Sequence, residues 1–101
     1  MQTAKISTSE AGGQITIKVE GNLIFDLNRE FRESYKGIPA KTPVIVDLAN
    51  ASYIDSAGIG MLIQLREHLG GNKGSVTVSG ANETVKTILN VANLGRLFKI
   101  S

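Results

Sequence analysis

The chain has 101 residues, 42% of them hydrophobic and 20% charged, which suits one globular domain with a single core. It contains no cysteine and one histidine, so disulfides, thiol catalysis, thiolate metal sites and multi-histidine metal sites are excluded. Eleven basic against nine acidic residues give a net charge of +2 without a basic cluster, and 5% aromatic residues leave little for stacking on bases; we expect no direct nucleic-acid binding.

The first half of the chain predicts a β-hairpin, a helix and a buried strand. Apolar residues at positions 15, 17 and 19 alternate with polar ones after a glycine turn, so residues of about 3–9 and 14–20 are expected to pair. Asp26 is placed to cap a helix that ends at Gly37. Its buried side is expected to carry Leu27, Phe31 and Tyr35. Residues 43–48 form a short β-branched run, typical of a strand covered on both faces.

The second half predicts two further helices with a strand between them. The first helix runs from Ser56 to about Leu69, and the strand covers residues 75–79. The second helix spans residues 83–91. It is expected to bury Val85, Ile88, Leu89 and Ala92. The last apolar residues, from 94 to 100, predict either a short helical turn or an edge strand.

The order of these elements predicts an α/β fold in one domain that covers residues 1–101. Strands that alternate with helices indicate right-handed crossovers, and hence a small mixed sheet of four to five strands with helices packed mainly on one face. Partner sites in such folds favour the loops after the strands, and Ala49 to Asp55 is expected to be one such loop.

The segment that begins at Asp55 is the most unusual in the chain. Ser56 is a good helix N-cap, and Asp55 adds negative charge near the helix's positive end; a capped helix start is therefore the simplest interpretation. Gly58 and Gly60, however, each cost ~1 kcal/mol relative to alanine in a helix. Glycine is useful where another backbone or a partner must approach closely.

A helical wheel divides this helix into two sides. The side expected to face the core carries Ile59, Leu62, Ile63, Leu65 and Leu69. The other side carries Ser56, Ala57, Gly60, Met61, Gln64, Glu67 and His68. Gly60 lies one turn after Ser56, so no side chain overhangs the hydroxyl. Met61 either adds an apolar contact to a docking surface there or dips into the core.

No arrangement of residues predicts catalysis. Ser56 and His68 are 12 positions apart, or ~18 Å along a helix, and cannot share a proton. Gly58 and Gly60 begin a dinucleotide fingerprint, but its third glycine would fall at Ile63. The glycine-rich residues 70–75 have the wrong order for a phosphate-binding loop. We therefore expect a protein that is not an enzyme and holds no metal and no cofactor.

Two segments together resemble the signature of the STAS domain family. Val46–Leu48, followed by the run Ile54–Gly60, is similar to the pattern of its bacterial branch of anti-sigma factor antagonists: an apolar residue, Asp, Ser, a small residue, Gly, an apolar residue and Gly. The similarity extends from residues 19–21 to residues 94–98, which is most of the chain.

The resemblance implies a phosphorylation-controlled binding module. In that family the serine that matches Ser56 is phosphorylated by a partner kinase. The unphosphorylated protein binds the anti-sigma factor or serine protein kinase, and a PP2C-type phosphatase removes the phosphate. The partner-binding residues it implies are Asn22, Ile24, Asp55, Ser56, Ala57, Gly58, Gly60, Met61 and Gln64. Ile24 and Phe25 stand where many members have an acidic residue, so part of this surface is expected to differ.

Another class of function stays open beside this one. Other STAS branches serve anion transporters or transport ATPase complexes, and a regulatory subunit of a transport ATPase would need Ser56 only for structure. A weak homo-oligomer is also left open. No apolar stretch approaches the roughly 20 residues of a membrane helix, and the first residues lack a signal-peptide pattern. We expect a cytoplasmic protein without membrane insertion.

Overall fold

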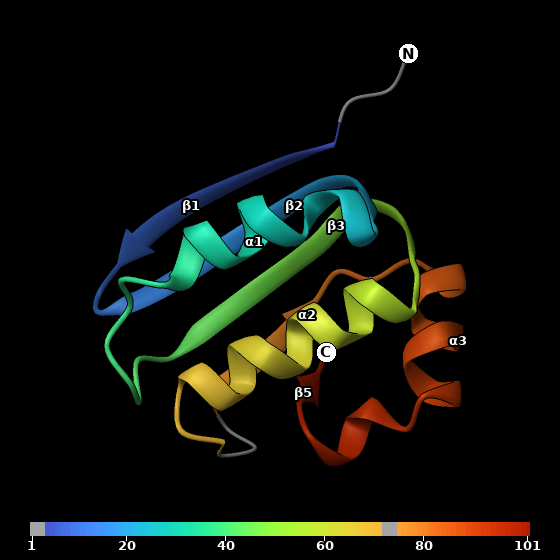
Figure 1. Ribbon diagram of the computed structural model, residues 1–101. Coiled ribbons are helices and arrows are strands. Elements are labelled where there is room, and N and C mark those ends of the chain that lie inside the picture. The colour runs from blue at the N-terminus through green and yellow to red at the C-terminus, as the bar shows by residue number, and fades with distance from the viewer. Residues whose placement is uncertain (1–3, 72–74) are drawn as a thin grey trace.

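The protein forms one five-stranded mixed sheet with helices packed mainly on one face, as the computed structural model of residues 4–71 and 75–101 shows (Figure 1). The strands, which lie in the sheet in chain order, are β1 (Lys5–Ala11), β2 (Gln14–Leu23), β3 (Val44–Ile54), β4 (Val76–Ser79) and β5 (Lys99–Ile100). The helices are α1 (Asn28–Tyr35), α2 (Ser56–His68) and α3 (Glu83–Val91), with 3-10 turns η1 (Phe25–Leu27) and η3 (Leu94–Arg96). β1 is antiparallel to β2, and the other neighbours are parallel.

The predicted hairpin is confirmed and is longer than expected. Ala11 pairs with Gln14 across a two-residue turn of Gly12 and Gly13, whose φ angles are +60° and +81°. Tight hairpin turns of this kind need positive φ at both central positions, which glycine adopts without strain.

The helices cover mainly one face of the sheet, as the sequence predicts. Val46 and Val78 pair across β3 and β4 and are buried, whereas the next pair, Asp47 and Ser79, is only half-buried. Because neighbouring strand residues point to opposite faces, the core lies on the valine side. Figure 1 shows α1 and α2 lying across the same face.

The start of the first helix differs from the expectation. The Leu27 amide donates to the Ile24 carbonyl at 2.9 Å, so the chain already turns before Asp26. Asp26 therefore lies inside η1 and is exposed, and it caps no helix; α1 begins at Asn28 without a side-chain cap. The three residues expected on the buried side are indeed buried: Leu27, Phe31 and Tyr35.

β3 is longer than the predicted strand. The segment expected to be a loop, Ala49 to Asp55, remains in the strand as far as Ile54 because it continues to pair with β2. Two register shifts, between Lys18 and Glu20 and between Gly21 and Asn22, let the pairing continue. Such irregularities bend a strand and interrupt the alternation of buried and exposed residues, so this part of β3 does not show the sequence pattern of a strand.

The second half follows the prediction with small corrections. α2 and α3 occupy the predicted positions, and Val85 and Leu89 are buried, with Ile88 half-buried. Ala92 is exposed, because α3 ends at Val91 and Ala92 follows as its C-cap. The last residues form both expected alternatives in succession, η3 and then β5. Part of the glycine-rich stretch, residues 72–74, lies outside the described residues.

Candidate functional site

The start of α2 is capped by Asp55 and not by Ser56. Asp55 has extended backbone angles, and its carboxylate Oδ1 accepts a hydrogen bond from the Gly58 amide at 2.8 Å. An N-cap residue precedes the first helical residue and accepts from an amide two or three residues later, which is what Asp55 does. The predicted capping role of Ser56 is therefore wrong. Ser56 is the first helical residue and is exposed, and within residues 4–71 and 75–101 its hydroxyl has no hydrogen-bond partner.

Gly58 is required by the packing of the chain itself. A Cβ at this position would lie 2.1 Å from the Leu23 carbonyl oxygen and 2.7 Å from Ile54 Cγ1. The same Leu23 carbonyl accepts from the Asp55 amide at 3.3 Å, so the end of β2 is bound to the start of α2. Gly58 is buried between these elements, so the partner-binding role that the resemblance implies for it is corrected to one in the packing of the chain.

Gly60 has the opposite surroundings. A Cβ there would meet no atom within 4 Å, so the space one turn after Ser56 is open, as the helical wheel predicts. Ala57 is half-buried and Gln64 is exposed. Ser56, Gly60 and Gln64 thus form the accessible part of the predicted surface on α2.

Met61 does not belong to that surface, because its side chain is only 3% exposed. The wheel misplaces it because α2 carries apolar residues almost all round and is covered from two sides. On one side His68 Nε2 lies 2.8 Å from the Ile38 carbonyl oxygen; on the other, Arg66 Nε donates to the Leu97 carbonyl at 3.1 Å. Ile59 and Ile63, both expected in the core, are only half-buried.

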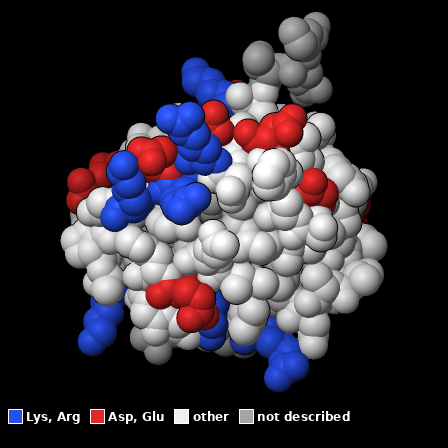
Figure 2. Space-filling model, in the orientation of Figure 1, with Lys and Arg blue, Asp and Glu red and all other residues white. Residues whose placement is uncertain are grey.

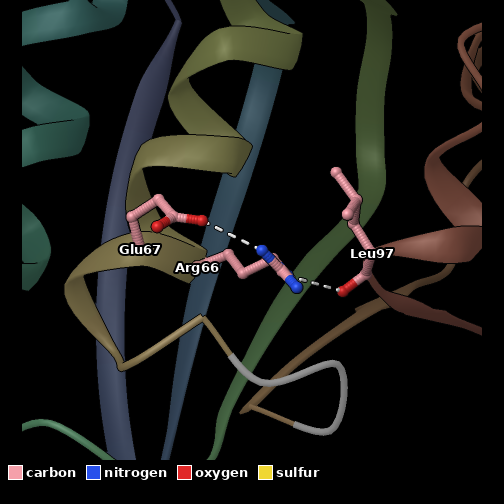
Figure 3. A network of polar contacts seen from close by, with 3 residues as sticks. All are labelled: Arg66, Glu67 and Leu97. Atoms are coloured by element: carbon pink, nitrogen blue, oxygen red, sulfur yellow. Dashed lines mark hydrogen bonds and ion pairs between the residues drawn. The ribbon is translucent and has the colours of Figure 1, made fainter.

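Arg66 ties the C-terminal half of α2 to the last segment of the chain (Figure 3). Besides the bond to Leu97, its Nη1 lies 2.9 Å from Glu67 Oε2. Most of the Arg66 side chain is buried, whereas that of Glu67 is largely exposed. The contact with Leu97 therefore orders the C-terminal segment, and the contact with Glu67 lies at the surface.

Three segments that follow strands meet at the start of α2. Asn22 at the end of β2 pairs with Tyr53 of β3. Asn82, the N-cap of α3, donates through Nδ2 to the Ala51 carbonyl at 3.3 Å, and Figure 1 shows the start of α3 beside the connection from β3 to α2. The Leu23 carbonyl accepts from the Asp55 amide at 3.3 Å, so the half-buried Asn22 and Ile24 flank a residue that is bonded to the neighbour of Ser56.

Two exposed aromatic side chains belong to this part of the chain; of these, Phe25 enters the sequence-based prediction only as a departure from the family pattern, and Tyr53 does not enter it. Phe25 is 69% exposed and Tyr53 is 46% exposed. The sequence does carry a signal for each: Phe25 falls outside the buried spacing of Leu27 and Phe31, and Tyr53 alternates with the buried Ile54. Neither signal reveals which element lies beside them, and for that the structure is needed.

The charges around the site are of one sign. Residues 19–28, 48–65 and 80–85 contain no Lys or Arg. Their acidic residues are the half-buried Glu20, the exposed Asp26 and Glu83, and Asp55, whose carboxylate is used in the cap. Figure 2 shows Lys and Arg gathered over α1, whereas the surface over the N-terminal half of α2 has none. An anion placed on Ser56 would therefore find no basic side chain from these segments.

The STAS domain family model matches residues 5–101. The chain belongs to the STAS domain family. A STAS-domain containing protein of Pseudomonas aeruginosa (strain UCBPP-PA14) is 39% identical to it over 95 residues, which cover 92% of this chain and 93% of that protein. This confirms the predicted family and, with the sheet described above, the predicted fold.

Solved anti-sigma factor antagonists share this fold. The antagonist from Mycobacterium paratuberculosis superposes with a TM-score of 0.83 at 16% identity, over 97% of this chain and 85% of that one. Unphosphorylated SpoIIAA gives 0.77 at 15% identity, over 96% and 88% of the two chains. The phosphorylated form of SpoIIAA, a Bacillus cell fate determinant, gives 0.62 at 13% identity, over 96% and 91%. At these identities the likeness concerns the fold alone.

Within the described residues, no helix is long and apolar enough to cross a membrane. The same residues hold no group of three or more His, Asp or Glu side chains arranged for a metal ion.

Proposed function

We propose that this STAS domain is a phosphorylation-controlled anti-sigma factor antagonist, a binding module that changes partners according to the state of Ser56. Unphosphorylated, it binds an anti-sigma factor, a serine kinase or a related regulator. Phosphorylation of Ser56 ends that binding, and a PP2C-type phosphatase restores it. The accessible surface around Ser56, including Asn22, Ile24, Gly60 and Gln64, is the contact.

One observation carries the proposal: Ser56 is exposed at a helix start that it does not cap. The Asp55 carboxylate already accepts the bond from Gly58 that a capping serine would provide. A serine that the helix does not need, beside the open space over Gly60, is available to another protein. A purely structural Ser56, as in a constitutive subunit of a transport ATPase, would be expected to accept that bond itself.

The proposed chemistry needs only the hydroxyl of this chain and the ATP of a partner kinase. Ser56 Oγ forms a bond to the γ-phosphorus, the bond from that phosphorus to the bridging oxygen breaks, ADP leaves, and the hydroxyl proton is released. The product carries roughly −1.5 to −2 charge at neutral pH. A contact made for a neutral hydroxyl would have to desolvate this charge, which is unfavourable without a basic group beside it.

The fold comparison supports the proposal through one related fold. SpoIIAA, an anti-sigma factor antagonist, exists in unphosphorylated and phosphorylated forms that share this fold. A fold alone does not determine function, so the argument for this chain depends on Ser56 and its surroundings.

The test is the intact mass of the protein isolated from its native cells, before and after treatment with a phosphatase. We expect one removable phosphate, which peptide mapping places on Ser56. Ser56→Ala should abolish it, whereas Ser52→Ala, at an exposed serine four residues earlier, should not. A protein without this phosphate through growth, starvation and stress, or with the phosphate on Ser52, would contradict the proposal and favour the transport subunit.

A further inference from the structure

The two exposed aromatic side chains at the site flank a single hydrogen bond. The Leu23 carbonyl accepts from the Asp55 amide, which joins the end of β2 to the start of α2. Phe25 lies two residues after Leu23, and Tyr53 lies two residues before Asp55. The backbone at both residues therefore lies near this bond and near Ser56, which follows Asp55 directly.

This placement is not that of scattered surface residues. The described residues expose three large apolar side chains, Phe25, Tyr53 and Val91, and two of them lie at this one junction. Val91 is the last residue of α3, about 12 Å along the helix from the end that approaches the site. Isolated exposed apolar residues are ordinary, but aromatic residues grouped at a site are typical of the centres of protein interfaces.

The segments of this junction supply two exposed carboxylates. Asp26 follows Phe25 directly, and Glu83 begins α3, whose N-cap Asn82 donates to the Ala51 carbonyl of β3. Because the three segments that form the junction contain no Lys or Arg, the charged side chains that they themselves supply are all acidic; Arg29 and Lys86 follow directly after two of them.

We infer that Phe25 and Tyr53 are the anchors through which this domain is recognised by the kinase that modifies Ser56. This inference rests on the proposed function and names its partner surface: an apolar pocket for the two rings, bordered by Lys or Arg side chains that face Asp26 and Glu83. Charge at the rim accelerates encounter, and the rings supply most of the affinity.

The experiment measures how fast Ser56 accepts thiophosphate. The purified chain is added to an extract of its native cells with ATPγS, whose thiophosphate product resists phosphatases, and mass spectrometry gives the initial rate at Ser56. Phe25→Ala, and Tyr53→Thr, which keeps a strand-forming residue, should each lower the rate about tenfold or more. Val91→Ala, the matched exposed control, should leave it unchanged, and circular dichroism verifies the fold of each variant.

The outcomes separate the inference from the proposal beneath it. If Ser56 of the parent chain is modified and Phe25→Ala and Tyr53→Thr are modified equally fast, the anchors are wrong while the proposed function stands. If the parent chain is never modified at Ser56, the proposed function fails, and the inference fails with it. The double variant Asp26→Asn/Glu83→Gln should be slower than the parent only at low salt; an equal or higher rate there would contradict the basic border of the pocket.

Discussion

Asp55 and Ser56 are neighbours with separate tasks. The Asp55 carboxylate accepts the bond from the Gly58 amide and adds negative charge at the positive end of α2. The Ser56 hydroxyl is left exposed at the first helical position. Because the helix depends on one residue and the proposed switch on the other, the serine can be modified without removal of the cap.

This division predicts that the free energy of unfolding is more sensitive to substitution of Asp55 than of Ser56. Asp55→Ala should lower the free energy of unfolding by ~1 kcal/mol, the usual loss for an N-cap. Ser56→Ala should change it by less than ~0.5 kcal/mol, as at most surface positions. Urea unfolding of both variants measures this, with Asp55→Asn as a control that keeps an oxygen acceptor. An equal loss for the two alanine variants would contradict the conclusion that Asp55, and not Ser56, caps α2.

The two glycines of α2 offer a second residue-level contrast. Gly58→Ala places a Cβ against the Leu23 carbonyl and should lower the free energy of unfolding by about 1–3 kcal/mol or more. Gly60→Ala meets no atom and should raise it by up to ~1 kcal/mol, since alanine is the better helix former. Thermal and urea unfolding of the two variants measure these changes. Effects of the same sign would contradict the close approach of Gly58 to the Leu23 carbonyl.

At the scale of elements, the sequence predicts what depends on local pattern. The alternation in β2, the turn at Gly12 and Gly13 and the spacing of apolar residues in α3 are local features, and these elements occur where expected. The length of β3 depends on its pairing with β2, which no local window contains.

The site follows the same rule. The sequence predicts that a helix begins at the Asp-Ser-x-Gly-x-Gly segment, residues 55–60, and that this helix follows a parallel strand. Three features were not predictable: that Met61 is buried, that Gly58 lies against Leu23, and that Phe25 and Tyr53 are exposed there. Each depends on which element packs beside α2, and therefore on contacts between residues far apart in the chain.

The contact between α2 and the C-terminal segment predicts an asymmetry between adjacent charged residues. Arg66→Met removes the donor to the Leu97 carbonyl and should lower the free energy of unfolding by about 1.5–3 kcal/mol, a typical value for a bond that involves a charged group. Glu67→Gln removes only an exposed ion pair and should cost less than ~0.5 kcal/mol.

Hydrogen exchange locates the effect. The Ser101 amide, which donates to the Val78 carbonyl at 2.9 Å, should exchange faster in Arg66→Met than in the parent chain or in Glu67→Gln. Equal losses of stability in the two variants, or an unchanged rate at Ser101, would show that Arg66 does not hold this segment.

At the scale of the whole molecule, the site and the core are separate. The core lies between the sheet and its helices. Ser56 lies where β2 and β3 end, near the start of α3. Among residues 4–71 and 75–101, no core side chain is hydrogen-bonded to the Ser56 hydroxyl. A charge added there therefore changes what the surface can bind more than it changes the fold.

The last prediction concerns phospho-Ser56 itself. Its phosphate would lie at the N-terminus of α2, where free amides and the helix dipole favour an anion, although the nearby Asp55 carboxylate offsets part of this gain. We expect unchanged circular dichroism and a melting temperature that is unchanged or raised by up to about 5 °C. Affinity for the purified kinase should fall about a hundredfold or more, since desolvating the phosphate costs several kcal/mol and each 1.4 kcal/mol is tenfold. Titration calorimetry of the parent, phospho-Ser56 and Ser56→Ala forms tests this: equal affinities would rule out the switch, and loss of structure on phosphorylation would rule out a purely interfacial mechanism.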